Sequence, residues 1–86
     1  MSGQDQRHQL RLVAGLAEQV GQPFIALDLP AGTTVEGLRQ QLAALYPHIV
    51  PLLGKSLLVA GDRILDDHAP LPTGEPLALV PPAAGG

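Results

Sequence analysis

Residues 29–47, LPAGTTVEGLRQQLAALYP, contain the one strongly amphipathic helix that this sequence predicts. Thr33 and Glu36 have the spacing of a capping box, so we expect the helix to begin just after Thr33. Pro47 disfavours helical geometry at the residue before it and therefore ends the helix. The apolar positions of the helix share one face: Val35, Leu38, Leu42 and Leu45. A helix with a single apolar face is typical of one that packs across a β-sheet.

Strands are expected on both sides of this helix. Apolar and polar residues alternate over residues 8–14 and 24–29, which is the period of a half-buried strand. Three short apolar segments after the helix complete the strand prediction: 57–60, 63–65 and 77–80. Residues 16–21 predict a short helical turn that ends at Gly21, and residues 49–53, interrupted by Pro51, predict a connecting turn. This order predicts one α+β domain.

The chain of 86 residues is poor in reactive side chains. It has no cysteine, which excludes a disulfide framework, a zinc ribbon and a thiol nucleophile. Its net charge of −3 is unlike the basic surface of a nucleic-acid-binding protein. The start of the chain is polar, and no apolar run approaches the roughly 20 residues that cross a bilayer. We therefore expect a cytoplasmic protein that binds neither nucleic acid nor membrane.

Three short motifs resemble chemical sites, but each has a plainer explanation. Residues 54–56, GKS, match the end of a phosphate-binding loop, yet Ile49 stands where that motif requires a glycine. The three histidines lack the spacing of a zinc site, so no metal is expected. Residues 66–68, DDH, could form an acid–base or metal cluster, although a solvated turn is the favoured interpretation. The sequence therefore does not predict a self-sufficient enzyme.

The last six residues, PPAAGG at 81–86, have the properties of a carrier tail. Pro81 and Pro82 hold the chain extended without internal hydrogen bonds. Gly85 and Gly86 have no Cβ, so such a tail fits a narrow tunnel and presents its carboxyl group to another protein. Terminal glycines also occur in disordered ends and cloning remnants. The position directly after an apolar strand favours the carrier interpretation.

The run LALVPPAAGG at 77–86 resembles the end of the small, ubiquitin-like subunit of molybdopterin synthase, a sulfur carrier of the MoaD/ThiS superfamily. That family closes with an apolar strand, Pro-Pro, two small or apolar residues and Gly-Gly. The likeness also includes the strand-to-helix junction at 29–35 and the strand and turn at 57–62. It implies a β-grasp domain over residues 1–80, with a mixed four- to five-stranded sheet and one main helix packed on one face. Residues 81–86 would form a flexible tail.

The resemblance also implies a function. An ATP-using, E1-like adenylyltransferase would activate the carboxyl group of Gly86, and a sulfurtransferase system would convert it to a thiocarboxylate. The tail would enter the large catalytic subunit of molybdopterin synthase and donate sulfur to cyclic pyranopterin monophosphate in molybdenum cofactor biosynthesis. The chain would bind no cofactor, and the catalytic residues would belong to the large subunit. Five residues would guide the passage of the tail: Pro81, Pro82, Ala83, Ala84 and Gly85.

Apolar residues of the sheet are candidates for the surface that docks on these partners: Val13, Leu77, Leu79 and Val80. Because side chains alternate along a strand, about half of them are expected to face the helix instead. Other functions share the fold and the terminus. They are a sulfur carrier for thiamine thiazole or another metabolite, a ubiquitin-like protein modifier, and a β-grasp interaction module that conjugates to nothing.

Overall fold

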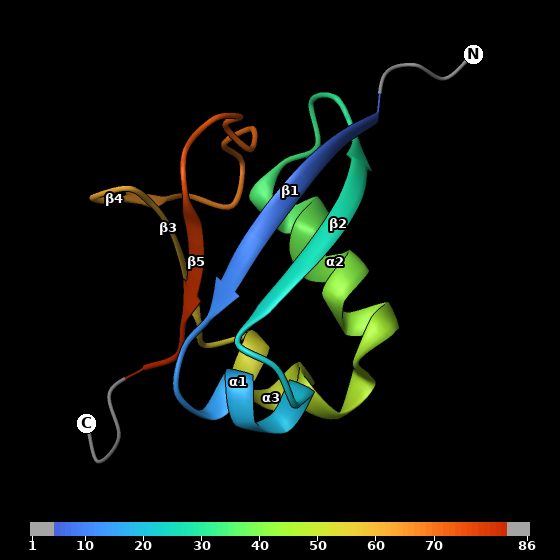
Figure 1. Ribbon diagram of the computed structural model, residues 1–86, viewed down its shortest axis with the longest axis vertical. Coiled ribbons are helices and arrows are strands. Elements are labelled where there is room, and N and C mark those ends of the chain that lie inside the picture. The colour runs from blue at the N-terminus through green and yellow to red at the C-terminus, as the bar shows by residue number, and fades with distance from the viewer. Residues whose placement is uncertain (1–4, 83–86) are drawn as a thin grey trace.

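The computed structural model describes residues 5–82, which form a five-stranded sheet with the main helix across one face (Figure 1). The order of the strands in the sheet is β2-β1-β5-β3-β4. β1 and β5 are parallel, whereas the other neighbouring strands are antiparallel, so the sheet is mixed. The strand bounds are β1 Asp5–Leu12, β2 Phe24–Pro30, β3 Leu57–Ala60, β4 Arg63–Leu65 and β5 Leu77–Val80.

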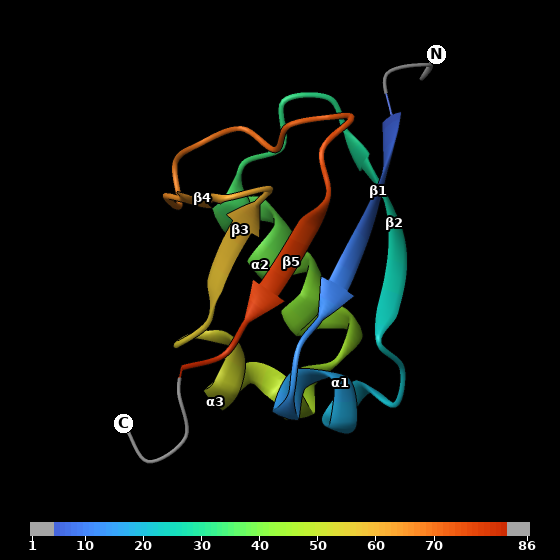
Figure 2. The same ribbon diagram turned by 60° about the vertical axis from the view of Figure 1, so that its left-hand side comes forward.

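The main helix is α2 (Val35–Leu45), and three short helical segments gather at one end of the sheet (Figures 1 and 2). These are α1 (Gly15–Val20), η1 (Pro47–Ile49) and α3 (Val50–Leu53). The predicted turn at 49–53 is thus mostly helical, because a proline in the first turn of a helix lacks only an N–H that has no partner there. Within residues 5–82, no helix is long and apolar enough to span a membrane.

The start of α2 differs by one residue from the prediction. Its N-cap is Thr34, whose Oγ1 accepts a hydrogen bond from the N–H of Gly37 at 3.2 Å. The hydroxyl of Thr33 instead donates to the carbonyl of Pro30 at 2.6 Å, so it belongs to the turn before the helix. Both threonines can cap a helix, and the turn after β2 selects the second.

A distant loop completes the cap of α2. The N–H groups of Val35 and Glu36 donate to the carbonyls of Ala69 and Asp67, each at 3.0 Å. These two N–H groups lie in the first turn, where a helix has no internal acceptor. The loop at 66–71 therefore holds the helix start in place of the predicted capping box.

Arg39 fastens α2 to the same loop and to the end of α3. Its Nε lies 3.1 Å from Oδ1 of Asp67, and its two terminal nitrogens donate to the carbonyls of Leu53 at 2.8 Å and Ser56 at 2.6 Å. Only 18% of its side chain is exposed. One guanidinium thus satisfies acceptors on two different segments.

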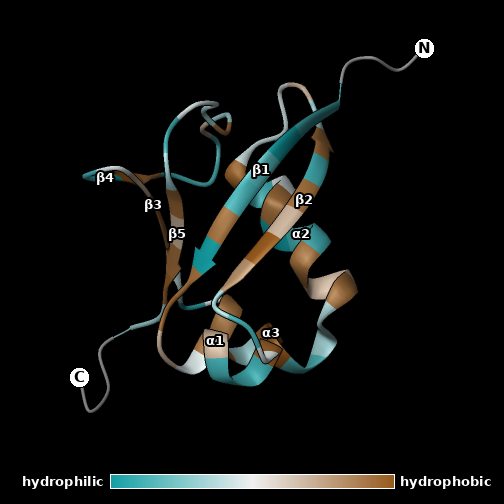
Figure 3. Cartoon of the chain, viewed as in Figure 1, coloured by the Kyte–Doolittle hydropathy of each residue, from teal (hydrophilic) through white to brown (hydrophobic). Residues whose placement is uncertain are grey.

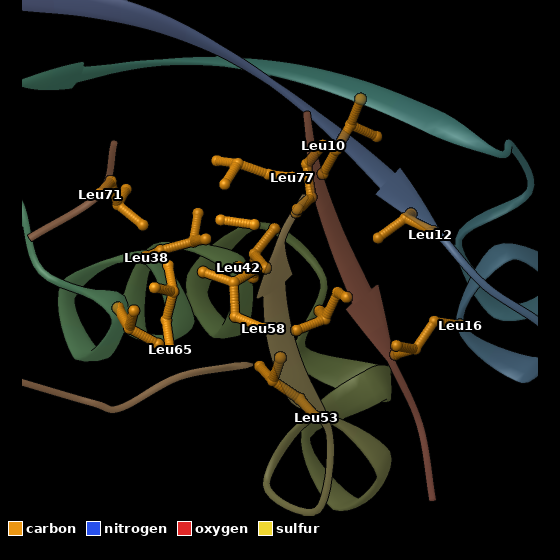
Figure 4. Close-up of a cluster of buried hydrophobic side chains, with 14 of the residues drawn as sticks. Leu10, Leu12, Leu16, Leu38, Leu42, Leu53, Leu58, Leu65, Leu71 and Leu77 are labelled. Atoms are coloured by element: carbon orange, nitrogen blue, oxygen red, sulfur yellow. The ribbon is translucent and has the colours of Figure 1, made fainter. Parts of the chain in front are cut away.

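The core lies between α2 and the sheet and is dominated by leucine (Figure 4). In Figure 3 the first part of β1 is hydrophilic, whereas β2 is mostly hydrophobic with a hydrophilic band toward its end. Val35, Leu38 and Leu42 of α2 are buried as predicted, but Leu45 is 48% exposed. Beside this last turn the fully buried Ile49 of η1 closes the core, so Leu45 stays outside. The sheet contributes Leu10, Leu12, Ile25, Leu29, Leu58, Ala60, Leu65, Leu77 and Leu79.

Candidate functional site

The predicted tail begins at a strongly anchored place. β5 lies between β1 and β3 in the sheet, so the strand that leads into Pro81 is paired on both sides. The N–H of Val13 donates to the carbonyl of Leu79 at 3.3 Å just before the strand ends. β5 points toward the end of the molecule where α1 and α3 lie (Figure 2). Pro81 therefore follows directly from a strand in the middle of the sheet.

Pro81 and Pro82 are the root of the tail, and an apolar cleft of about 460 Å³ lies beside them. Pro81 and Pro82 line it directly, as do residues of the β1–α1 turn and of α3. The remaining predicted passage residues, Ala83, Ala84 and Gly85, and the predicted reactive residue Gly86 lie outside the described residues. The other lining residues are Val13, Ala14, Gly15, Leu52 and Val80.

The turn that forms one wall of this cleft contains the one non-glycine residue of positive φ among residues 5–82. Ala14 has φ 52° and ψ −125°, and the N–H of Leu16 closes the turn on the carbonyl of Val13 at 3.2 Å. That conformation favours glycine and costs an alanine on the order of 1–2 kcal/mol. A Cβ added to Gly15 would lie 3.3 Å from Cδ2 of Leu52, so the next position is also restricted in size.

The four predicted docking residues divide into two pairs. Val13 and Val80 are half-buried and line the cleft at the root of the tail. Leu77 and Leu79 are 3% and 1% exposed and belong to the core. Strand alternation directs these two leucines toward α2. The prediction that they belong to a docking surface is therefore wrong.

The face of the sheet away from α2, the open face, carries exposed apolar residues that the sequence reasoning missed. One row crosses all five strands in register and consists of Phe24, Arg11, Ala78, Val59 and Ile64. Phe24 is 50% exposed and Ile64 65%, and Leu57 on the same face is 48% exposed. A mixed apolar and polar surface of this kind is typical of a protein interface. The sequence did carry a signal for these exposed residues. Each of them adjoins a buried residue in its strand, so alternation directs it to the opposite face.

The motifs that resembled chemical sites have structural roles. Asp67 pairs with Arg39 and caps α2, and the hydroxyl of Ser56 donates to the carbonyl of Leu52 at 2.8 Å. Nε2 of His48 lies 2.8 Å from the carbonyl oxygen of Gln19. Across residues 5–82, no three acidic, histidine or cysteine side chains are grouped closely enough to hold a metal ion. Asp67, Ser56 and His48 thus form contacts that hold the fold together.

Fold and site together define a class of protein. The α+β architecture, with its mixed five-stranded sheet, one main helix and tail after the central strand, is that of a ubiquitin-like β-grasp protein, as predicted. The chain belongs to the ThiS family, whose model matches residues 10–86. It is thus a member of the ThiS/MoaD superfamily of ubiquitin-like sulfur carriers. No curated protein matches the sequence.

Several solved structures share the fold. The HVO 2177 protein of Haloferax volcanii is 28% identical, with a TM-score of 0.79 over 96% of this chain and 89% of that one. SAMP1 of the same organism is 21% identical, with a TM-score of 0.78 over 94% of this chain and 100% of that one. A chain of the complex between subunits 1 and 2 of the molybdopterin-converting factor of Helicobacter pylori is 20% identical. Its TM-score is 0.63 over 94% of this chain and 100% of that one.

Proposed function

We propose that this protein is the sulfur-carrier small subunit of a molybdopterin synthase, with Gly86 as the residue that carries sulfur. The observation that carries the proposal is the root of the tail, where a central strand leads through two prolines toward Gly-Gly. A reactive group on the main chain needs no catalytic side chain. This agrees with the roles of Asp67, Ser56 and His48, all of which are engaged in holding the fold.

The chemistry starts from a carboxylate, which is a poor electrophile. A carboxylate oxygen of Gly86 attacks the α-phosphorus of ATP on an adenylating partner, and pyrophosphate leaves. Hydrosulfide delivered by a sulfurtransferase system then adds to the acyl carbon and expels AMP, which leaves a thiocarboxylate. Its sulfur is ionised and nucleophilic near neutral pH, as thiolates are. ATP is thus a co-substrate of the partner, and the carrier itself holds no cofactor. We place these steps in the cytoplasm.

Transfer occurs on a second partner, the large catalytic subunit. The thiocarboxylate sulfur of Gly86 attacks a side-chain carbon of cyclic pyranopterin monophosphate, and the oxygen substituent of that carbon leaves as water or as the phosphate oxygen. Water then hydrolyses the resulting thioester, which leaves sulfur on the substrate and restores the carboxylate of Gly86. The likeness to a chain of the Helicobacter pylori complex supports a partner of this kind. Val13 and Val80, beside the exit of the tail, are proposed to contact both partners, and Pro81 and Pro82 to direct the tail away from the body.

A modifier is the second candidate, and the likeness to SAMP1 favours it. In that case the amine of a lysine, and not sulfide, attacks the acyl carbon of adenylated Gly86. A carrier for thiamine thiazole or another metabolite would share every step before sulfur transfer. The candidates therefore differ in the fate of the activated carboxyl group.

Intact-mass measurement after co-expression with an adenylating enzyme and a sulfurtransferase separates these functions. The carrier proposal expects a mass gain that equals one sulfur-for-oxygen exchange, absent when Gly86 is deleted. Covalent adducts with other proteins would contradict the carrier proposal and support the modifier function. An unchanged mass would contradict both functions. A strain that lacks the chain should lose molybdenum cofactor. If the strain lost only the ability to make thiamine, the protein would instead be the sulfur carrier for thiamine thiazole.

A further inference from the structure

β1 has a strand partner on only one side over its first half. β2 pairs with it from Asp5 to Arg11, whereas β5 pairs with it only from Leu10 to Leu12. Within residues 5–82, the edge of Asp5–Gln9 that faces away from β2 thus has no neighbouring strand. In Figure 2 this part of β1 extends beyond the start of β5. An interior strand of the sheet therefore has a free edge.

The backbone groups on this free edge can be identified. Leu12 donates its N–H to the carbonyl of Pro23 on the β2 side, and Val13 donates its N–H to the carbonyl of Leu79 on the β5 side. Because successive residues of a strand direct these groups to opposite edges, Arg7 directs its N–H and its carbonyl, and Gln9 its N–H, toward the vacant side, whereas the carbonyl of Gln9 belongs to the parallel pairing of Leu10 with Leu77. Unpaired strand groups of this kind are a template for another strand.

A groove of about 560 Å³ lies beside the free edge. Residues of the turn at 72–76 line it, as do Phe24 of β2 and Ala78 of β5, which flank Arg11 in the sheet. An ion pair of 2.7 Å between Arg63 and Glu75 fixes this turn. The groove therefore combines backbone hydrogen-bonding groups with an exposed aromatic ring.

The charge of the groove is unbalanced. Arg7 and Arg11 line it together with one acidic residue, Glu75, which is already paired with Arg63. Arg7 is paired with Asp28 at 3.3 Å, but Arg11 forms no ion pair with any residue between 5 and 82. An exposed guanidinium beside a groove favours a carboxylate on the occupant.

We propose that the groove binds an extended acidic peptide segment of a partner protein, which adds as a strand beside Asp5–Gln9 in line with β5. Main-chain hydrogen bonds to Arg7 and Gln9 provide the affinity, and Arg11 selects for an acidic side chain. Five residues of the segment span about 17 Å, at roughly 3.4 Å per residue. The groove flanks the start of β5, whereas the tail follows its end, so both can be occupied at once. This inference does not depend on the carrier function.

The test is a titration of the ¹⁵N-labelled full chain with the peptide acetyl-Val-Asp-Val-Asp-Val-amide. In the free protein, the N–H groups of Arg7 and Gln9 should exchange with solvent faster than those of His8 and Leu10, which face β2. The peptide should slow exchange at Arg7 and Gln9. The matched peptide with lysine in place of aspartate should bind at least about tenfold more weakly.

Variants of the chain test the role of charge. Arg11→Glu should weaken binding of the acidic peptide by about tenfold or more, while Lys55→Glu, an exposed charge change outside the groove, should not. Should Arg11→Glu fail to fold, Arg11→Gln should still weaken binding. Any of three results would overturn the proposal: no binding at millimolar peptide, equal binding of the lysine peptide, or unchanged exchange at Arg7 and Gln9.

Discussion

The two faces of the sheet use the same strands for different purposes. On β5, Leu77 and Leu79 are buried under α2, whereas Ala78 and Val80 between them are half-buried on the open face. On β4, Leu65 is 9% exposed and its neighbour Ile64 is 65% exposed. The covered face is aliphatic and closed, and the open face mixes apolar side chains with arginine. The comparison shows that the covered face stabilises the domain, whereas the open face leaves apolar side chains exposed to solvent.

The largest effect is expected on the covered face. Leu42→Ala removes a side chain that is fully buried, so the free energy of unfolding should fall by about 2–5 kcal/mol. Leu45→Ala, on the same helix but 48% exposed, should cost less than about 1 kcal/mol. Urea denaturation of both variants measures the difference. Equal losses would mean that α2 does not pack as described.

A smaller effect is expected from the polar contacts that hold the helix over that face. Arg39→Met removes the donors to the carbonyls of Leu53 and Ser56 and should cost about 1–3 kcal/mol. Arg7→Met is the matched control, because the Arg7–Asp28 pair is solvent-exposed and should contribute less than about 1 kcal/mol. If thermal unfolding shows the two variants to be equally stable, the network of Arg39 is as weak as a surface ion pair.

The smallest effect on stability is expected on the open face. Ile64→Thr keeps a β-branched side chain and should change the free energy of unfolding by less than about 0.5 kcal/mol. We also propose that the exposed Ile64 contacts the adenylating partner, so Ile64→Thr should raise the KM of that partner several-fold because it removes apolar area from the contact. Leu45→Gln, an exposed site on the helix, should leave that KM unchanged. A KM unaffected by Ile64→Thr would remove this residue from the interface.

Local signals in the sequence predicted the elements well. Alternation predicted β1 and β2, although β1 spans Asp5–Leu12 instead of residues 8–14, because Ala14 has a positive φ in the turn that follows the strand. The apolar run at 77–80 predicted β5, and Gly21 ended α1 as expected, with φ 93° and its N–H 2.8 Å from the carbonyl of Ala17. Each of these depends on neighbours in the chain. The errors at α2 occurred where another segment contacts the helix, either the adjacent turn and η1 or the distant loop at 66–71. Thr34 replaces Thr33 as the cap, the carbonyls of the loop at 66–71 complete the helix start, and Ile49 closes the core where Leu45 was expected.

The sequence by itself determined the class of fold, the absence of thiol chemistry and the Gly-Gly end, because composition and periodicity are properties of the chain alone. Only the tertiary structure decided which half of each alternating strand is surface. Alternation divides Leu77 and Leu79 from Ala78 and Val80 but does not say which pair α2 covers. Packing settles that choice for the whole sheet at once, and with it the positions of the open face and the free edge of β1.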